Sequence, residues 1–165
     1  MTLQPLTNAR WGFTSNCFVC EPTNPSGLQL PFFHDDDTEE VVADFELGDA
    51  FSGAPSYLHG GVVLSVLDEA MAWAAIAVAG QWAVTRTSTT DFARPVRVGR
   101  PHQVRASIAT TSEREIGAVA VILDAKGRTC ATAKAVFTPL GEAQAVDAIG
   151  GRDGLEAGFL RRSDA

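Results

Sequence analysis

Two acidic residues interrupt an apolar segment and are the first candidates for chemistry in this sequence. Asp68 and Glu69 lie within residues 60–80, a run without a single Lys or Arg to pair with them. Burying an unpaired carboxylate is costly, so the pattern favours a carboxylate that acts as a base or a nucleophile. The alternative is that one acid faces a gap open to solvent or caps backbone N–H groups.

The glycines that open the same segment could stabilise an oxyanion. Gly60 and Gly61 follow His59 at the start of the expected helix, where backbone N–H groups lack partners and the helix dipole favours negative charge. A carbonyl oxygen that becomes an oxyanion would be stabilised there. The alternative is a tight loop-to-helix turn that needs glycine for its backbone angles.

The spacing of these residues predicts a site shared between two chains. Gly60 and Asp68 are eight residues apart, about 12 Å along one helix, so one carbonyl cannot contact both in the same chain. If both act on one substrate, two antiparallel copies of the helix must meet, which predicts a dimer with two equivalent sites. Glu69 lies about 100° further round the helix. Only one of the two acids then faces the site, and we favour Asp68.

One helix and several strands must position these residues. Apolar side chains on all faces of residues 60–79 predict a helix that is buried on all sides. Alternating and β-branched stretches predict strands over residues 28–33, 40–47, 84–92, 102–112, 116–123 and 129–138. This order predicts an α+β fold, in which a curved antiparallel sheet of about five or six strands wraps one long buried helix.

The chain is long enough for one domain. Its 165 residues divide into an expected irregular N-terminal arm (residues 1–27), a folded domain (residues 28–140) and a loose C-terminal tail (residues 141–165). Within the tail, residues 155–161 could form a short helix.

Charge and composition exclude several classes of function. With 13 basic and 20 acidic residues the net charge is −7, which does not suit a nucleic-acid-binding protein. The first residues lack the basic and apolar stretches of a signal peptide, and two acids interrupt the longest apolar run. We therefore expect a cytoplasmic protein that does not insert into a membrane.

The three cysteines give no disulfide framework, because their number is odd. Cys17 and Cys20 form a lone CxxC pair, and a four-ligand zinc site would need two further ligands at suitable spacing. We therefore predict no metal site and assign the pair to packing of the arm against the domain.

Three segments in order carry a resemblance to a known family. In the first, His59, Gly60 and Gly61 are followed by six residues and then Asp68. The others are CFVCEPTNPSGLQL at residues 17–30 and TRTSTTDFARPVRVG at residues 85–99. Together they resemble the hotdog-fold acyl-CoA thioesterases, specifically the PaaI-like branch.

The resemblance implies a function and an assembly. It implies hydrolysis of an acyl-CoA to a free acid and CoA, without a metal or a cofactor, in homodimers that often pair into tetramers. By position, Gly60 would supply the oxyanion-hole N–H and Asp68 would be the catalytic acid residue, activating water or attacking the thioester itself. Thr85 matches a hydroxyl that helps to hold the attacking water, and Asp68 and Thr85 would face Gly60 of the partner chain.

Further residues are candidates for substrate binding. Some relatives carry Asn or Gln upstream of the histidine, but residues 52–56 contain no amide side chain. The thioester carbonyl would then contact backbone donors, including that of Gly61, or Ser56 or His59. Trp73 could line an acyl pocket, and its alternative place is the core. Arg94 and Arg97 could bind the phosphates of CoA, and their alternative is a solvated strand end.

Two other functions stay open at this point. The missing amide would suit a non-catalytic hotdog protein that binds acyl-CoA or another small ligand. A thioesterase that acts on acyl chains bound to a carrier protein is the second alternative, although the acidic surface argues against docking on an acidic carrier. The sequence does not specify the acyl group.

Overall fold

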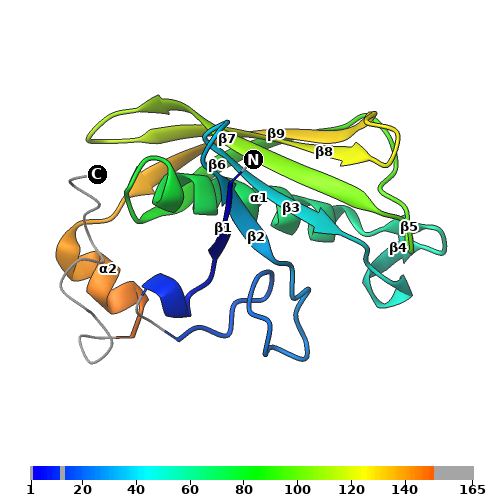
Figure 1. Cartoon of the computed structure of the whole chain (residues 1–165), viewed down its shortest axis with the longest axis horizontal. Helices are drawn as coiled ribbons and strands as arrows, with labels where there is room; N and C mark the ends of the chain where they lie inside the picture. The colour runs from blue at the N-terminus through cyan, green and yellow to red at the C-terminus, as the bar shows by residue number, and fades with distance from the viewer. Residues whose placement is uncertain (1, 12–13, 151–165) are drawn as a thin grey trace.

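A long helix lies against one face of an antiparallel sheet (Figure 1). The computed structural model describes residues 2–11 and 14–150. Seven strands form the main sheet: β1 (Leu3–Leu6), β2 (Phe32–Asp35), β3 (Glu40–Phe45), β6 (Ala83–Phe92), β7 (His102–Thr111), β8 (Ile116–Asp124) and β9 (Thr129–Pro139). The helices and smaller elements are η1 (Ala9–Trp11), η2 (Asp49–Phe51), the hairpin of β4 (Ser52–Ala54) and β5 (Tyr57–Leu58), α1 (Gly60–Ala77) and α2 (Glu142–Ala148). The predicted α+β architecture is confirmed.

Local signals at both ends fix the length of α1. The imidazole Nδ1 of His59 accepts a hydrogen bond from the Gly61 N–H at 2.9 Å and caps the first turn. At the other end, Gly80 adopts a φ of 69°, a left-handed conformation that favours glycine and ends the helix. The helix therefore begins where the sequence predicted and ends two residues earlier.

The core forms between α1 and the concave side of the sheet. The strand order is β1-β2-β3-β7-β8-β9-β6, and every neighbouring pair is antiparallel. Buried residues alternate with more exposed ones along β7, β8 and most of β9, so one face of each strand points to α1. The large buried side chains include Leu67 and Met71 from the helix and Val104, Ile116, Ile122 and Phe137 from the sheet.

The helix is not buried on all sides, contrary to the prediction. Gly61, Leu64, Ser65, Asp68 and Ala72 recur every three or four residues and form one stripe that is exposed or half-buried, with Leu64 41% exposed. We call these five residues the open face of α1. The sheet of one chain can cover only one side of a helix, so an all-round apolar pattern leaves apolar surface on the other side. By length and composition α1 could span a membrane, but it packs against β3, β6, β7, β8 and β9, as a core helix does.

The N-terminal and C-terminal predictions need correction. The arm over residues 1–27 is not irregular throughout, because Leu3–Leu6 pairs with β2 and raises the sheet to seven strands. The first predicted strand begins at residue 32 rather than 28, since Gln29 has a φ of 55° and Pro31 has no N–H to donate. The tail begins with α2, and the helix predicted near residues 155–161 lies outside the described residues.

Strand β6 forms one edge of the sheet and is exposed along most of its ten residues. It pairs with β9 on one side, and within residues 2–11 and 14–150 no strand pairs with its other side. Apolar side chains are exposed near both ends, with Val84 49% and Phe92 51% exposed. A long exposed edge of this kind is a ready template for pairing with another strand.

The packing of α1 predicts a clear contrast between two leucines. Leu67 is 1% exposed beneath the sheet, whereas Leu3 on β1 is 41% exposed. We expect Leu67→Ala to lower the free energy of unfolding by about 2–5 kcal/mol, because it removes buried methyl groups and leaves a cavity. The control Leu3→Ala should change it by less than about 0.5 kcal/mol. Urea denaturation of both variants measures the difference, and equal losses would contradict the described packing.

Candidate functional site

The structure brings Asp68 and Thr85 together. The hydroxyl Oγ1 of Thr85 donates a hydrogen bond to Oδ1 of Asp68, with the two oxygens 2.8 Å apart. Asp68 comes from the open face of α1 and Thr85 from β6, 17 residues later in the chain. Asp68 is half-buried and Thr85 is exposed, so this carboxylate lies at the boundary between the core and the open face.

A local irregularity in β6 aims Thr85 at the helix. The pairing register of β6 with β9 shifts between Thr85 and Thr87, where Thr85 opposes Phe137 and Thr87 opposes Val136. The extra residue of such a bulge bends the strand and redirects its side chains, and bulges are common next to active sites. The sequence predicted the strand and singled out Thr85, but not the bulge.

Glu69 points away from Asp68 and toward the N-terminal arm. Its Oε1 accepts a hydrogen bond from the Cys17 thiol, with sulfur and oxygen 3.3 Å apart. Burial is the main cause that raises the pKa of Glu69 to about 8, so near neutral pH its carboxyl group is mostly protonated and a poor base. The two acids thus have different surroundings, and those of Glu69 leave Asp68 as the better candidate for a catalytic base.

The helix N-terminus presents one backbone donor without a partner. The N–H groups of Val62 and Val63 bond to the carbonyl oxygen of His59, and that of Gly61 bonds to its ring. The Gly60 N–H makes no hydrogen bond within the part of the chain that the structure describes. Gly60 is exposed, and its φ is not in the left-handed region. Backbone angles therefore do not require glycine there, and the exposed donor agrees with the oxyanion prediction.

Gly60 and Asp68 do not meet within one chain. Both lie on the single straight run of α1, about 12 Å apart along its axis. A side chain at Gly60 would contact only the Phe92 ring, at 3.9 Å from its Cβ position. The donor and the carboxylate are therefore two separate features of one exposed surface, as the sequence spacing predicted.

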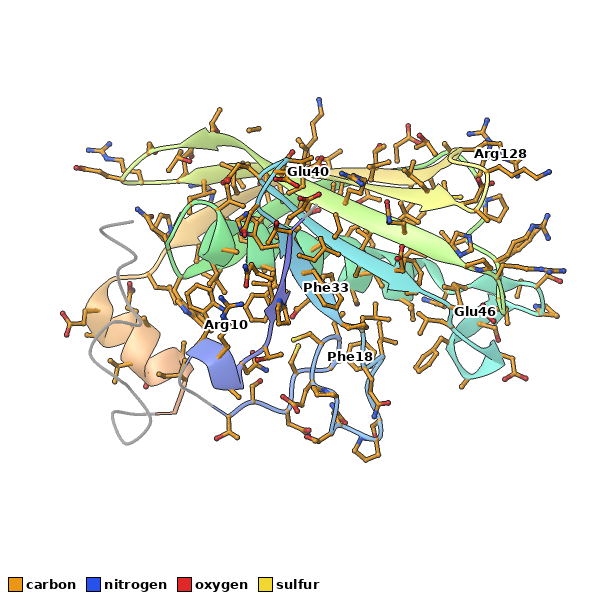
Figure 2. The ribbon with its side chains drawn as sticks, viewed as in Figure 1. Arg10, Phe18, Phe33, Glu40, Glu46 and Arg128 are labelled. Carbon is orange, nitrogen blue, oxygen red and sulfur yellow. The ribbon has the colours of Figure 1, made fainter. Side chains whose placement is uncertain are left out.

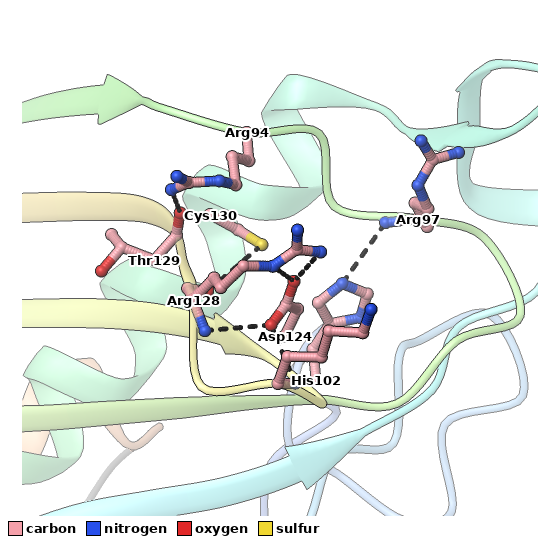
Figure 3. Close-up of polar contacts among 8 residues, drawn as sticks. Arg94, Arg97, His102, Asp124, Arg128, Thr129 and Cys130 are labelled. Atoms are coloured by element: carbon pink, nitrogen blue, oxygen red, sulfur yellow. Dashed lines mark hydrogen bonds and ion pairs between the residues drawn. The ribbon is translucent and has the colours of Figure 1, made fainter.

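A basic pocket of about 540 Å³ lies at the end of β6 and the loop that follows it. Five cationic side chains and one carboxylate are among its lining residues: Arg94, Arg97, Arg100, Lys126, Arg128 and Asp124. Figure 3 shows Arg128 next to Asp124, with an Nη2–Oδ2 distance of 2.7 Å, and Arg94 donating to the Thr129 carbonyl at 2.8 Å. The Arg128 guanidinium lowers the pKa of Asp124 to about 2. Positive charge is thus concentrated here, in a chain of net charge −7.

Backbone pairing ties this pocket to the helix N-terminus. Tyr57 and Arg97 form an antiparallel bridge, and the Arg97 guanidinium lies 5.3 Å from the centre of the Tyr57 ring. The Leu58 N–H donates to the Val96 carbonyl at 2.9 Å. The loop that carries Arg97 is therefore fastened to the residues that lead directly into Gly60.

Two predicted substrate-binding residues, Trp73 and Ser56, lie in different surroundings. Trp73 is 3% exposed in the core, so in a single chain it does not line an open pocket. Its buried indole N–H has no hydrogen-bond partner among the described residues. Ser56 is exposed, and its carbonyl oxygen accepts a hydrogen bond from the Val98 N–H at 3.1 Å.

Sequence reasoning missed part of the basic pocket. Lys126 and Arg128 join Arg94, Arg97 and Arg100 only because the turn between β8 and β9 folds next to the loop after β6. The only local signal was the pair of Asp124 and Arg128, four residues apart around a hairpin turn. The sequence predicted the two strands that this turn joins, but it did not indicate that the turn lies next to the loop after β6.

Comparison with known proteins assigns the central segment of the chain to a family. The sequence model of the family described as the thioesterase superfamily matches residues 56–131. This segment belongs to the thioesterase superfamily. It contains the helix N-terminus, Asp68, Thr85 and all the residues that line the basic pocket. No curated protein sequence gives a significant match.

Solved structures agree on the fold. A thioesterase superfamily protein is 24% identical, with a TM-score of 0.69 over 74% of this chain and 62% of its own, so the chain spans less than two thirds of that relative. The Escherichia coli PaaI protein from the phenylacetic acid degradation operon is 22% identical, with a TM-score of 0.59 over 62% of this chain and 74% of its own. A Streptococcus pneumoniae protein described as a hypothetical thioesterase, solved with coenzyme A, is 16% identical, with a TM-score of 0.59 over 62% and 79%. The predicted hotdog thioesterase resemblance is confirmed at the level of superfamily and fold.

Proposed function

We propose that this thioesterase superfamily chain hydrolyses an acyl-CoA thioester to a free acid and CoA. The observation that carries the proposal is the pair of Asp68 and Thr85, held together at 2.8 Å on the open face of a core helix. A carboxylate there can reach a substrate, and its threonine donor holds it in one orientation. The superfamily match and the coenzyme A in the pneumococcal relative support the choice of thioester chemistry.

The reaction uses Asp68 as general base. Its carboxylate takes a proton from water while the water oxygen attacks the thioester carbonyl, and Thr85 fixes the acceptor oxygen. Negative charge then forms on the carbonyl oxygen, which the Gly60 N–H and the positive end of the helix dipole stabilise. When the tetrahedral intermediate collapses, the carbon–sulfur bond breaks and the proton on Asp68 passes to the departing CoA sulfur.

The site requires a homodimer. Because Gly60 and Asp68 lie about 12 Å apart on α1, the oxyanion donor must come from a second copy whose helix runs antiparallel. Asp68 on the open face of α1 bonds to Thr85 on the exposed edge strand β6, so the open face and this edge form one surface for such a contact. A twofold axis beside β6 would join two β6 edges and cover both open faces at once. The dimers could pair further into tetramers.

The basic pocket would bind the nucleotide end of CoA. Coenzyme A carries several phosphate groups, which guanidinium groups bind through charge-assisted hydrogen bonds. Arg97 is held by Tyr57 beside the loop that leads to Gly60, which suits a ligand that extends from this pocket to the helix N-terminus. The acyl group would lie at the other end of the ligand, against the open face of α1.

Removing the charge of Asp68 should abolish hydrolysis. We expect Asp68→Asn to lower kcat at least about 100-fold, because the amide cannot accept the proton of the attacking water. Release of free thiol from short, medium, long and aromatic acyl-CoA esters measures the rate. The control Asp147→Asn, on the exposed side of α2, should keep wild-type rates. Full activity of Asp68→Asn would refute the assignment, and binding of esters without hydrolysis by the wild type would favour a ligand-binding hotdog protein.

Neutralising the basic pocket should weaken recognition of CoA but not the chemical step. We expect the double variant Arg97→Gln, Arg100→Gln to raise KM for acyl-CoA about tenfold or more, with a smaller change in kcat. For an acyl-N-acetylcysteamine, which has the thioester but no phosphate, kcat/KM should stay within about twofold of wild type. The control Arg114→Gln removes an exposed arginine at the turn before β8. Equal losses on both substrates would contradict a phosphate-binding role.

A further inference from the structure

A cluster of three potential metal ligands lies where the N-terminal arm crosses α1. The two thiol sulfurs of Cys17 and Cys20 and a carboxylate oxygen of Glu69 lie within 4.8 Å of one another, and all three residues are half-buried. Glu69 comes from the helix, 52 residues after Cys17. In Figures 1 and 2 the arm, with Phe18 labelled, passes the helix on the side away from β8 and β9. Two distant parts of the chain therefore supply the cluster.

The cysteine spacing alone predicted no metal site, but with Glu69 beside the two sulfurs we propose that Cys17, Cys20 and Glu69 bind one zinc ion, which fastens the arm to α1. Zinc in proteins binds thiolates at about 2.3 Å and carboxylate oxygens at about 2.0–2.2 Å in tetrahedral geometry. Those lengths separate a sulfur and an oxygen ligand by about 3.6 Å. The observed separation of the Cys17 sulfur and the Glu69 oxygen is 3.3 Å, so a small shift admits the ion. Water would fill the fourth position.

The turn that carries the cysteines is shaped like a metal-binding knuckle. The backbone N–H groups of Val19 and Cys20 both point at the Cys17 sulfur, each at 3.4 Å. Such donors stabilise a thiolate, the form that binds zinc. The turn therefore offers the Cys17 sulfur two donors that a bound thiolate would use.

Neighbouring residues hold this turn in place without an ion. The Leu28 N–H donates to the Phe18 carbonyl at 2.8 Å. Gly27 permits this approach, because a Cβ there would lie 2.6 Å from the same carbonyl oxygen. The Asn24 amide donates to the carbonyl oxygens of Asn16 and Cys17 at 3.1 and 3.4 Å. The two sulfurs are thus positioned in advance, which reduces the entropic cost of binding a metal.

Among the described residues, the cluster forms no ion pair with a cationic side chain. Among the ion pairs formed within residues 2–11 and 14–150, none includes Glu69. Half-buried groups that become negative when they lose their protons need a nearby positive charge, and a divalent cation bound by all three supplies it. Soft thiolates together with one carboxylate suit zinc better than magnesium or calcium. The two cysteines, Asn24 and Gly27 all belong to one segment, residues 17–30, which both shapes the turn and supplies the thiol ligands.

Cobalt substitution tests the site directly. The full chain, freed of metal with a chelator under reducing conditions, is titrated with Co²⁺ alone. We expect one Co²⁺ per chain, with a thiolate-to-cobalt charge-transfer band and the visible bands of a tetrahedral site. Added Zn²⁺ should displace the Co²⁺ and abolish these bands. Cys17→Ser and Cys20→Ser should remove the charge-transfer band, whereas the control Cys130→Ser in β9 should keep it. Glu69→Gln should weaken Co²⁺ binding about tenfold or more.

A measurement on the wild type guards against variants that fail to fold. Zinc should raise the melting temperature of the metal-free chain and slow alkylation of Cys17 and Cys20, with no effect on Cys130. Binding without a thiolate band, or loss of binding in Cys130→Ser, would overturn the proposal. A third result would also overturn it: protein purified under reducing conditions with zinc supplied that holds no zinc and has a disulfide between Cys17 and Cys20. None of these readouts depends on thioester hydrolysis, so they test the zinc site independently of the proposed activity.

Discussion

The packing of α1 against one side of the sheet decides where every polar group on that helix can go. Val66, Leu67 and Met71 fill the space between helix and sheet and leave no room for charge. A carboxylate on this helix must therefore lie toward the open face or beneath the arm. Asp68 takes the first position and Glu69 the second, and a rotation of about 100° between neighbours is enough to give them different chemistry.

The rigidity of the same helix imposes the second constraint. Its N-terminal donor at Gly60 and its carboxylate at Asp68 stay about 12 Å apart whatever binds, because helix length is fixed. A site that uses both features must be completed by another chain. The exposed edge of β6, the exposed ring of Phe92 beside Gly60 and the open face of α1 all lie where that chain would dock. The proposed dimer and the proposed active site thus rest on the same geometric constraint.

Much of this could be predicted from the sequence, for reasons that differ by element. The helix and the strands β3 and β6 to β9 follow from apolar periodicity and β-branched composition, so their predicted bounds lie close to the observed ones, whereas the short hairpin of β4 and β5 was not predicted. The short strand Leu3–Leu6 carries no periodic signal and depends on pairing with β2. The open face of α1 was missed because Leu64 resembles the buried Leu67 in type, and only tertiary contacts separate them. The apolar surroundings in the sequence singled out Asp68, and the family resemblance singled out Thr85. Their hydrogen bond and the contact of Glu69 with Cys17 join segments that no local pattern links.

Mixing two inactive chains tests the shared site most directly. Gly60→Pro removes the N–H at the first helical position, where proline is well tolerated, and the ψ of 137° at His59 already suits a following proline. Gly60→Ala keeps the N–H and serves as the matched control. When Gly60→Pro and Asp68→Asn chains are co-expressed, half of the dimers are mixed and each holds one intact site, so about a quarter of the wild-type thioesterase activity should return. The contradicting result is that each variant is inactive alone and that the mixture is inactive too, although mass measurement verifies its heterodimers. That result would exclude a site built from two chains.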